Sequence, residues 1–170
     1  MIFERLIREV KDFPKLGINF RDITPVLQDP TGFKEVIDAF TDRYKSKNIQ
    51  GIAAIESRGF LIAAPMAIEL ELPLLLIRKK GKLPFETKTV TYDLEYGTDS
   101  LEMHVDSISD TDNLVLIDDL MATGGTLAAA AKLIEDLGGI VLEVGVIIEL
   151  IDLKGREKLK RIPVHSLCKI

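Results

Sequence analysis

Short apolar runs alternate with helical patterns along most of the chain. The apolar runs that predict buried strands cover residues 51–56, 72–77, 114–117 and 140–150. Apolar residues at helical spacing predict helices over residues 2–10, 31–47 (with Thr31 as the cap), 59–71 and 126–137. Continuous apolar strands separated by helices indicate an α/β fold, in which a parallel sheet is flanked by helices on both faces.

Two segments depart from this alternation. Residues 13–30 are rich in Pro, Gly, Asn and Asp, which predicts an ordered loop. Within residues 79–106, apolar and polar side chains alternate over 101–105, which predicts a strand paired antiparallel to 88–94. A hairpin that is inserted between parallel strands and carries Lys, Glu and Tyr is a candidate lid for an active site.

Composition and charge narrow the possible classes of protein. The chain has 170 residues without a repeat or polar linker, so we expect a single domain over residues 1–170. The formal net charge is −5, so the chain as a whole lacks the excess of basic residues that is typical of nucleic-acid-binding proteins. Prolines and glutamates interrupt the longest apolar stretch, residues 60–77, so we expect no membrane association. A single cysteine, Cys168, and the lack of a secretory signal favour the cytoplasm.

Ligands of an open parallel sheet bind beyond the carboxyl ends of its strands. That rule selects three segments, residues 56–59, 78–82 and 118–126. The third belongs to the string VLIDDLMATGGT, in which Gly124 and Gly125 allow backbone N–H groups to face a ligand at a helix start. The string therefore predicts a phosphate-binding loop, although its spacing matches neither a Walker A loop nor a dinucleotide fingerprint.

The adjacent carboxylates Asp118 and Asp119 add a further constraint. Two negative charges beside a phosphate are tolerable only if they bind hydroxyls, a metal ion or a cation that develops during a reaction. A phosphorylated sugar supplies both the phosphate and the hydroxyls. Because neighbouring strand residues point to opposite faces, we expect only one of the two to reach the sugar directly, and which one stays open.

The string VLIDDLMATGGT resembles the phosphoribosyl-pyrophosphate motif of the type I phosphoribosyltransferases, and the chain is similar to the members that act on adenine. Five further matches follow the family order: FPKLGINFRDITPVLQDP, ESRGF, IRKKGKLP, TYDLEYGT and LKGREKL. The resemblance implies a type I fold with an inserted antiparallel lid hairpin and an N-terminal hood segment. It also implies a purine salvage reaction, in which phosphoribosyl pyrophosphate and adenine give AMP and pyrophosphate.

The resemblance also implies roles for individual residues. The 5′-phosphate would be held by Ala122, Thr123, Gly124, Gly125 and Thr126. Pyrophosphate would contact Ser57 and Arg58, helped by Arg78 and Lys82 from the same subunit or a neighbouring one. The adenine would be bordered by Asn19, Phe20, Arg21 and Leu153. Catalysis would rest on Arg58, on Asp118 and Asp119 at the ribose, and on the lid residues Glu95 and Tyr96. Of these, Glu95 would face the adenine ring nitrogen whose proton shifts.

Mg²⁺ is expected to arrive with the sugar pyrophosphate and to have no direct protein ligand. The family is typically homodimeric, so the resemblance implies a homodimer. Asn19 stands where the family usually has an aliphatic residue, which leaves open the same reaction on another purine base. A regulator that senses phosphoribosyl pyrophosphate is the second alternative, and the acidic composition counts against it.

Overall fold

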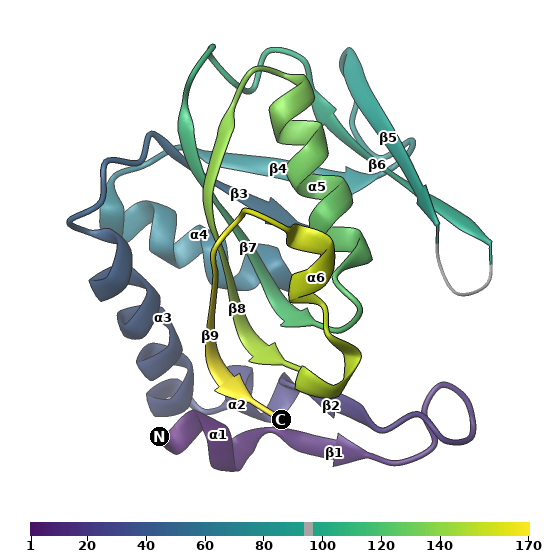
Figure 1. Ribbon diagram of the computed structural model, residues 1–170. Helices are drawn as coiled ribbons and strands as arrows, with labels where there is room; N and C mark the ends of the chain where they lie inside the picture. Colours follow the sequence, from purple (N-terminus) through teal and green to yellow (C-terminus); the bar gives the residue numbers. More distant parts are fainter. Residues whose placement is uncertain (94–96) are drawn as a thin grey trace.

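The computed structural model describes residues 1–93 and 97–170, and a mixed seven-stranded sheet forms its centre (Figure 1). The strands lie in the order β5-β6-β4-β3-β7-β8-β9. Their bounds are β3 (Gly51–Ile55), β4 (Leu74–Lys79), β5 (Thr87–Asp93), β6 (Thr98–His104), β7 (Asn113–Met121), β8 (Ile140–Glu149) and β9 (Val164–Lys169). Strands β4, β3, β7, β8 and β9 run parallel, which confirms the parallel sheet.

The antiparallel hairpin β5–β6 extends one edge of the same sheet. It follows β4 in the chain, and β6 pairs antiparallel with β4 at Arg78 and Lys79. The hairpin is therefore inserted between parallel strands in the sequence but lies beside them in space. Val90 and Leu101 are buried at the base of the hairpin, which anchors it to the core.

Helices cover both faces of the sheet (Figure 1). On one face lie α3 (Pro30–Tyr44) and α4 (Arg58–Leu70), and on the other lie α5 (Gly125–Asp136) and α6 (Arg156–Leu159). Alternate residues of a strand point to opposite faces of the sheet and pack into the two separate cores. Ile52 belongs to the core under α3 and α4, whereas Ala53 belongs to the core under α5. This two-sided burial explains why the strands appear as continuous apolar runs in the sequence.

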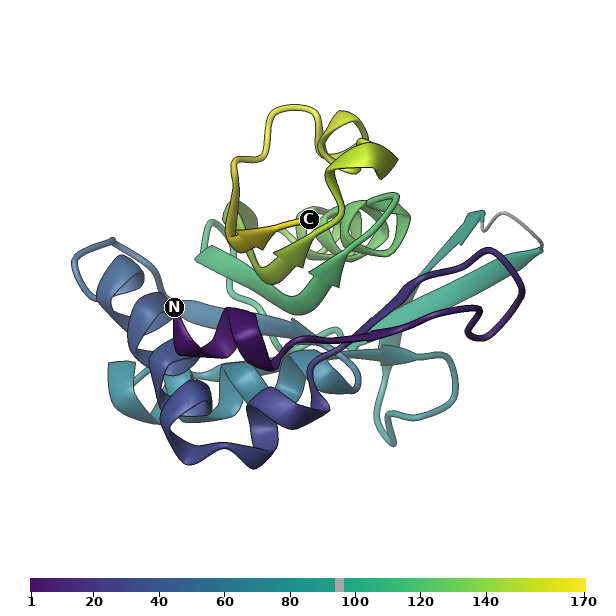
Figure 2. The same ribbon diagram turned by 90° about the horizontal axis from the view of Figure 1, so that it is seen from below.

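The N-terminal segment packs below the carboxyl ends of the parallel strands (Figures 1 and 2). It contains α1 (Ile2–Leu6), β1 (Arg8–Val10), β2 (Phe20–Asp22) and α2 (Thr24–Gln28). The prediction of one helix over residues 2–10 is wrong beyond Leu6, because β1 pairs antiparallel with β2. The prediction of a loop over residues 13–30 is likewise wrong in part, since β2 and α2 lie within that range.

Several element boundaries also differ from the prediction. Helix α3 is capped by Asp29 rather than Thr31, because Gly32 N donates to Asp29 Oδ1 at 2.7 Å. Strand β7 continues past residue 117 because Met121 still pairs with Glu149 of β8. Beyond β8, the short helix η1 (Ile151–Leu153), α6 and β9 were not predicted. None of the described helices is long and apolar enough to cross a membrane.

Candidate functional site

Two adjoining cavities open at the carboxyl ends of the parallel strands. The first, which we call the strand-end cavity, measures ≈ 420 Å³ and is lined by residues of two segments, 55–58 and 118–127. The second, the hood cavity, measures ≈ 790 Å³ and lies between the N-terminal segment and the sheet. Its lining comprises Lys15, Gly17, Ile18, Asn19, Asp93, Ala122, Thr123, Gly125, Leu150, Leu153 and Lys158. The two cavities share Ala122, Thr123 and Gly125.

The shared wall is the loop of residues 122–126, which leads into α5. Gly124 has a φ of +76° and serves as the N-cap, and no side chain of the described residues caps this helix. The N–H groups of the first turn of α5 therefore lack side-chain acceptors and can bind an anion. Thr126 adds a hydroxyl, which donates a 3.4 Å hydrogen bond to the Tyr92 hydroxyl of β5.

The loop has this shape because the segment around Gly155 packs directly behind it. A Cβ on Gly155 would lie 2.5 Å from Ala122 O and 2.9 Å from Met121 Cγ. A Cβ on Gly124 would in turn collide with Gly155 O. Both positions thus require glycine, and the chain after β8 determines where the loop sits.

The acid pair at the end of β7 faces the strand-end cavity, and the prediction that only one of its members reaches a sugar stays a prediction. Both Asp118 and Asp119 line the cavity. The strict alternation of β7 between the two faces breaks here, since Ile117 and Leu120 both pack on the α3–α4 side. Within the pair, Asp119 N donates to Asp118 Oδ1 at 2.9 Å.

Their electrostatic environments differ. Burial raises the pKa of Asp118 well above its ordinary value, and the neighbouring charge of Asp119 raises it further. Asp119 is 4% exposed and lies beside Arg58, whose Nε is 2.7 Å from Asp119 Oδ2. The angles of that contact do not make a hydrogen bond, so Asp119 Oδ2 remains a buried acceptor without a donor. A ligand hydroxyl would satisfy this oxygen if the pair opened slightly.

Residues predicted to bind pyrophosphate are brought together only in part. Ser57 and Arg58 line the strand-end cavity where α4 begins, after a cis peptide bond between Glu56 and Ser57. Arg78 lies behind them, because its Nε donates to Glu56 Oε2 at 2.8 Å. Lys82 lines neither cavity, and its backbone N–H donates to Glu102 Oε1.

Residues predicted to border a ring are also divided. Asn19 and Leu153 both line the hood cavity. Phe20 lies beside it, in edge contact with Phe13 and with the Arg58 guanidinium 5.3 Å from its ring centroid. Arg21 lines neither cavity and forms an ion pair with Glu9 at 2.9 Å. Glu95 and Tyr96 lie outside the described residues.

Some lining residues escaped the sequence reasoning. Lys15, Ile18, Asp93 and Lys158 line the hood cavity, and the ion pair of Glu56 with Arg78 was not predicted, although the segment 56–59 was selected. The LKGREKL match contained Lys158 but gave no reason to single it out. Among the described residues, no cluster of three His, Cys, Asp or Glu side chains could hold a metal ion.

Residues 22–169 match the family described as the phosphoribosyl transferase domain. An adenine phosphoribosyltransferase of Roseiflexus sp. (strain RS-1) is 52% identical over 162 residues, which span 95% of this chain and 94% of the relative. The crystal structure of adenine phosphoribosyltransferase from Thermoanaerobacter pseudethanolicus has a TM-score of 0.96 at 47% identity, covering 99% of this chain and 98% of that one. The Saccharomyces cerevisiae enzyme, complexed with adenine and an imino-altritol bisphosphate, has a TM-score of 0.93 at 37% identity, covering 98% and 97%.

Proposed function

The chain belongs to the phosphoribosyl transferase domain family and transfers a phosphoribosyl group to adenine in purine salvage, and from this premise we propose that the two adjoining cavities form its active site. The observation that carries this proposal is the loop 122–126. It forms the start of a helix, belongs to both cavities and lies beside the acid pair. A substrate that carries a phosphate, a sugar and a leaving group would place its phosphate at the loop and its sugar beside the acid pair.

The reaction joins a ring nitrogen of adenine to the anomeric carbon of phosphoribosyl pyrophosphate. The bond from that carbon to the pyrophosphate oxygen breaks, pyrophosphate leaves with the bonding electrons, and the ring nitrogen loses its proton. Adenine is itself the nucleophile, so no protein nucleophile is required. The protein must hold the donor, stabilise positive charge at the sugar and negative charge at the leaving group, and keep water away.

We assign the 5′-phosphate to Ala122, Thr123, Gly124, Gly125 and Thr126. The N–H groups at the start of α5 point their partial positive charge at this position, and the threonines add hydroxyl donors. The glycines admit the phosphate close to the backbone because no Cβ intervenes. This binding fixes the sugar relative to the strand ends.

We assign Asp118 and Asp119 to the ribose. Both line the strand-end cavity, and a carboxylate there accepts hydrogen bonds from sugar hydroxyls and favours cationic character at the anomeric carbon. In this structure Asp119 Oδ2 is buried and is paired with Arg58, whose Nε lies 2.7 Å away. When pyrophosphate attracts Arg58, Asp119 is released from its ion pair and becomes free to bind the ribose.

Arg58, Ser57, Arg78 and Lys82 would neutralise the pyrophosphate. Arg58 lines the strand-end cavity and would contact the pyrophosphate directly. Arg78 does not line that cavity and donates a hydrogen bond to Glu56. We propose that a Mg²⁺ ion comes with the donor, because that ion keeps several waters and binds through substrate phosphates. Such an ion would neutralise charge on the leaving group, and no protein side chain is assigned to it.

We place the adenine in the hood cavity, between Asn19 and Leu153, with Phe20 and Arg21 at its border. Leu153 supplies an apolar wall, and the Asn19 amide offers hydrogen bonds to the edge of the base. Glu95 and Tyr96 are assigned to the lid by resemblance alone, with Glu95 as the group that accepts the proton of the ring nitrogen.

We further propose a cytoplasmic homodimer. Three apolar side chains on α4 and β4 are exposed, namely Ile68, which is 81% exposed, Leu61 and Leu76. An exposed apolar patch of this kind is typical of a subunit interface. Lys82, which lies away from both cavities, is then available to a neighbouring subunit. The single free cysteine accords with a reducing compartment.

A base panel tests the proposal. Purified protein is given phosphoribosyl pyrophosphate, Mg²⁺ and, in turn, adenine, hypoxanthine, guanine or xanthine, and the nucleotide and pyrophosphate are quantified. We expect AMP from adenine and little product from the other bases. A preference for another base would contradict the adenine assignment, and binding without turnover would favour a regulator. The variant Asn19→Val, run on the same panel, reports whether this amide contributes to base choice.

A further inference from the structure

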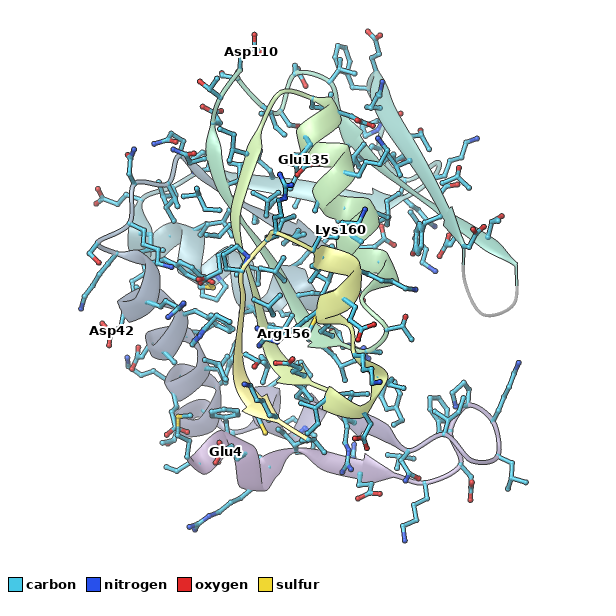
Figure 3. The ribbon with its side chains drawn as sticks, in the orientation of Figure 1. Glu4, Asp42, Asp110, Glu135, Arg156 and Lys160 are labelled. Carbon is cyan, nitrogen blue, oxygen red and sulfur yellow. The ribbon has the colours of Figure 1, made fainter. Side chains whose placement is uncertain are left out.

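A lysine beyond the motif residues lies against the phosphate loop. The short helix α6 lies next to the start of α5, and Figure 3 shows Arg156 and Lys160 on this helix and just after it. Between them in the sequence, Lys158 directs its ammonium group at the loop. A Cβ built on Gly125 would have Lys158 Nζ as its nearest neighbour at 3.6 Å, followed by Asp93 O and Thr123 Oγ1, each at 3.9 Å.

The positive charge of Lys158 has no counter-charge within the part of the chain that the structure describes. It forms no hydrogen bond or ion pair among the residues that the structure describes, although it lines the hood cavity. Arg58, which lines the strand-end cavity, is by contrast occupied by Asp119. The loop 122–126 contains no cation of its own. A dianionic phosphate at this loop would have Lys158 as its nearest available cation.

The position of Lys158 is fixed by its own helix. Arg156 Nη2 donates to Glu149 Oε2 at 2.6 Å, and Arg156 Nη1 donates to Val164 O at 2.9 Å. Glu149 is 4% exposed and also accepts from Ser166 Oγ at 2.7 Å. These contacts tie α6 to the ends of β8 and β9, while Gly155 packs against Gly124. Helix α6 is thus held in register with the phosphate loop.

We propose that Lys158 binds the phosphate monoester of the phosphoribosyl substrate, opposite the N–H groups of α5. The proposal rests on the assignment of the 5′-phosphate to the loop 122–126. The ammonium group forms a charge-assisted hydrogen bond with a phosphate oxygen, from the side of the hood cavity. Because the donor and the AMP product carry the same 5′-phosphate, this contact holds the sugar phosphate in both.

The test compares ligands that differ by one phosphate. Isothermal titration calorimetry measures AMP and adenosine binding to the wild type and to Lys158→Gln, Lys158→Arg and Lys160→Gln. Lys160→Gln removes the same charge two residues away, on a side chain that lines neither active-site cavity. We expect Lys158→Gln to weaken AMP by about tenfold or more and to leave adenosine unchanged. Lys158→Arg should retain most of the affinity, and Lys160→Gln should match the wild type.

The steady-state kinetics give a second readout. Lys158→Gln should raise KM for phosphoribosyl pyrophosphate more than it lowers kcat, because the contact is made in both the ground state and the transition state. Equal AMP affinity in the wild type and Lys158→Gln would overturn the proposal. An equal loss in Lys160→Gln would overturn it too, since a general electrostatic effect would then suffice. A wild type that makes no AMP would refute the proposed function instead, which keeps the two failures distinct.

Discussion

Asp118 is a carboxyl group that the folded chain holds in an unfavourable environment. Burial raises its pKa well above the ordinary value of 3.8, and the negative charge of Asp119 raises it further. The folded chain thus binds this proton more tightly than the unfolded chain does. Ionised Asp118 therefore destabilises the fold, beginning as the pH rises above 3.8 and reaching its full effect above the folded-state pKa. The fold retains a group that costs stability, which is typical of a functional site.

Replacing Asp118 separates stability from activity. We expect Asp118→Asn to raise the free energy of unfolding at pH 7, because the amide carries no charge, and to lower kcat about tenfold or more. Urea unfolding at pH 7 and pH 4 measures the first effect, which should shrink at the lower pH. The exposed Asp152→Asn is the matched control and should change neither quantity. Loss of stability in Asp118→Asn at pH 7 would show that the carboxylate is favourable where it lies.

At the scale of residues, the sequence identified the acid pair and the phosphate loop but not their geometry. The residue types of 118–126 suggest phosphate and hydroxyl binding directly, because few other ligands suit glycine, threonine and paired acids. The ion pair of Asp119 with Arg58 depends on where α4 starts relative to β7, which no local pattern records. Lys158 approaches Gly125 only through the packing of two segments far apart in the chain.

At the scale of elements, the contact between the phosphate loop and the segment after β8 decides whether the loop is correctly shaped. Gly155 touches no proposed substrate atom, yet its Cβ position is 2.5 Å from Ala122 O. We expect Gly155→Ala to displace the loop, lower kcat/KM for the donor by about 10–100-fold, and destabilise the fold by about 1–3 kcal/mol.

Gly139→Ala provides the control for that substitution. Gly139 follows the other end of α5, and its Cβ would press on Ile134 Cγ2 at 2.9 Å. This variant should also lose stability, but its kinetics should match the wild type. Steady-state kinetics and urea unfolding on both variants separate the two effects. A Gly155→Ala enzyme with an unchanged KM for the donor would show that the loop does not depend on this contact.

Most of the elements that were predicted correctly share one property, whereas the β5–β6 hairpin was predicted from the alternation of polar and apolar residues. Strands β3, β4, β7 and β8 and helices α3, α4 and α5 are long or continuously apolar, so burial alone reveals them. Strand β9, VHSLCK, is half-buried and mixes polar with apolar residues, so periodicity does not distinguish it from a loop. Strand β1 has three residues and depends on pairing with β2 and on ion pairs such as Arg21–Glu9. Such elements exist because of tertiary contacts.

At the scale of the whole molecule, a buried ion pair joins the α3 layer to the sheet. Glu143 of β8 accepts hydrogen bonds from Arg43 Nε at 2.6 Å and Arg43 Nη2 at 2.7 Å, and from Lys47 Nζ at 3.1 Å. Burial raises the pKa of Glu143, but these hydrogen bonds outweigh burial and lower the pKa from 4.5 to about 2. The pair therefore stabilises the fold above about pH 4.5, and this contribution is lost as the pH falls toward 2.

Acid titration of stability tests this coupling. We expect Glu143→Gln to lower the free energy of unfolding by about 1–2 kcal/mol at pH 7, because it leaves two partly solvent-exposed cations without a counter-charge. The wild type and the variant should converge as the pH approaches 2. Asp38→Asn, which removes an exposed pair with Lys34, should cost under about 1 kcal/mol. A difference for Glu143→Gln that stays constant from pH 7 to pH 2.5 would contradict the assignment.

The arrangement of the whole molecule also accounts for the position of the site. Parallel strands bring residues 56–58 and 118–126 to one edge of the sheet, and the N-terminal segment closes that edge from below (Figure 2). The hood cavity exists because residues 15–19 of that segment meet the loop after β7 and the chain after β8. Its outline was therefore beyond the reach of sequence patterns, although Asn19 and Leu153 were named from the family resemblance.

A crystal structure of the chain with bound AMP tests the central assignment most directly. We predict the phosphate oxygens within hydrogen-bond distance of the N–H groups of residues 123–126. We predict the ribose hydroxyls at Asp118 or Asp119, and the adenine in the hood cavity between Asn19 and Leu153. Well-ordered AMP with its phosphate bound outside the loop 122–126 would contradict the account.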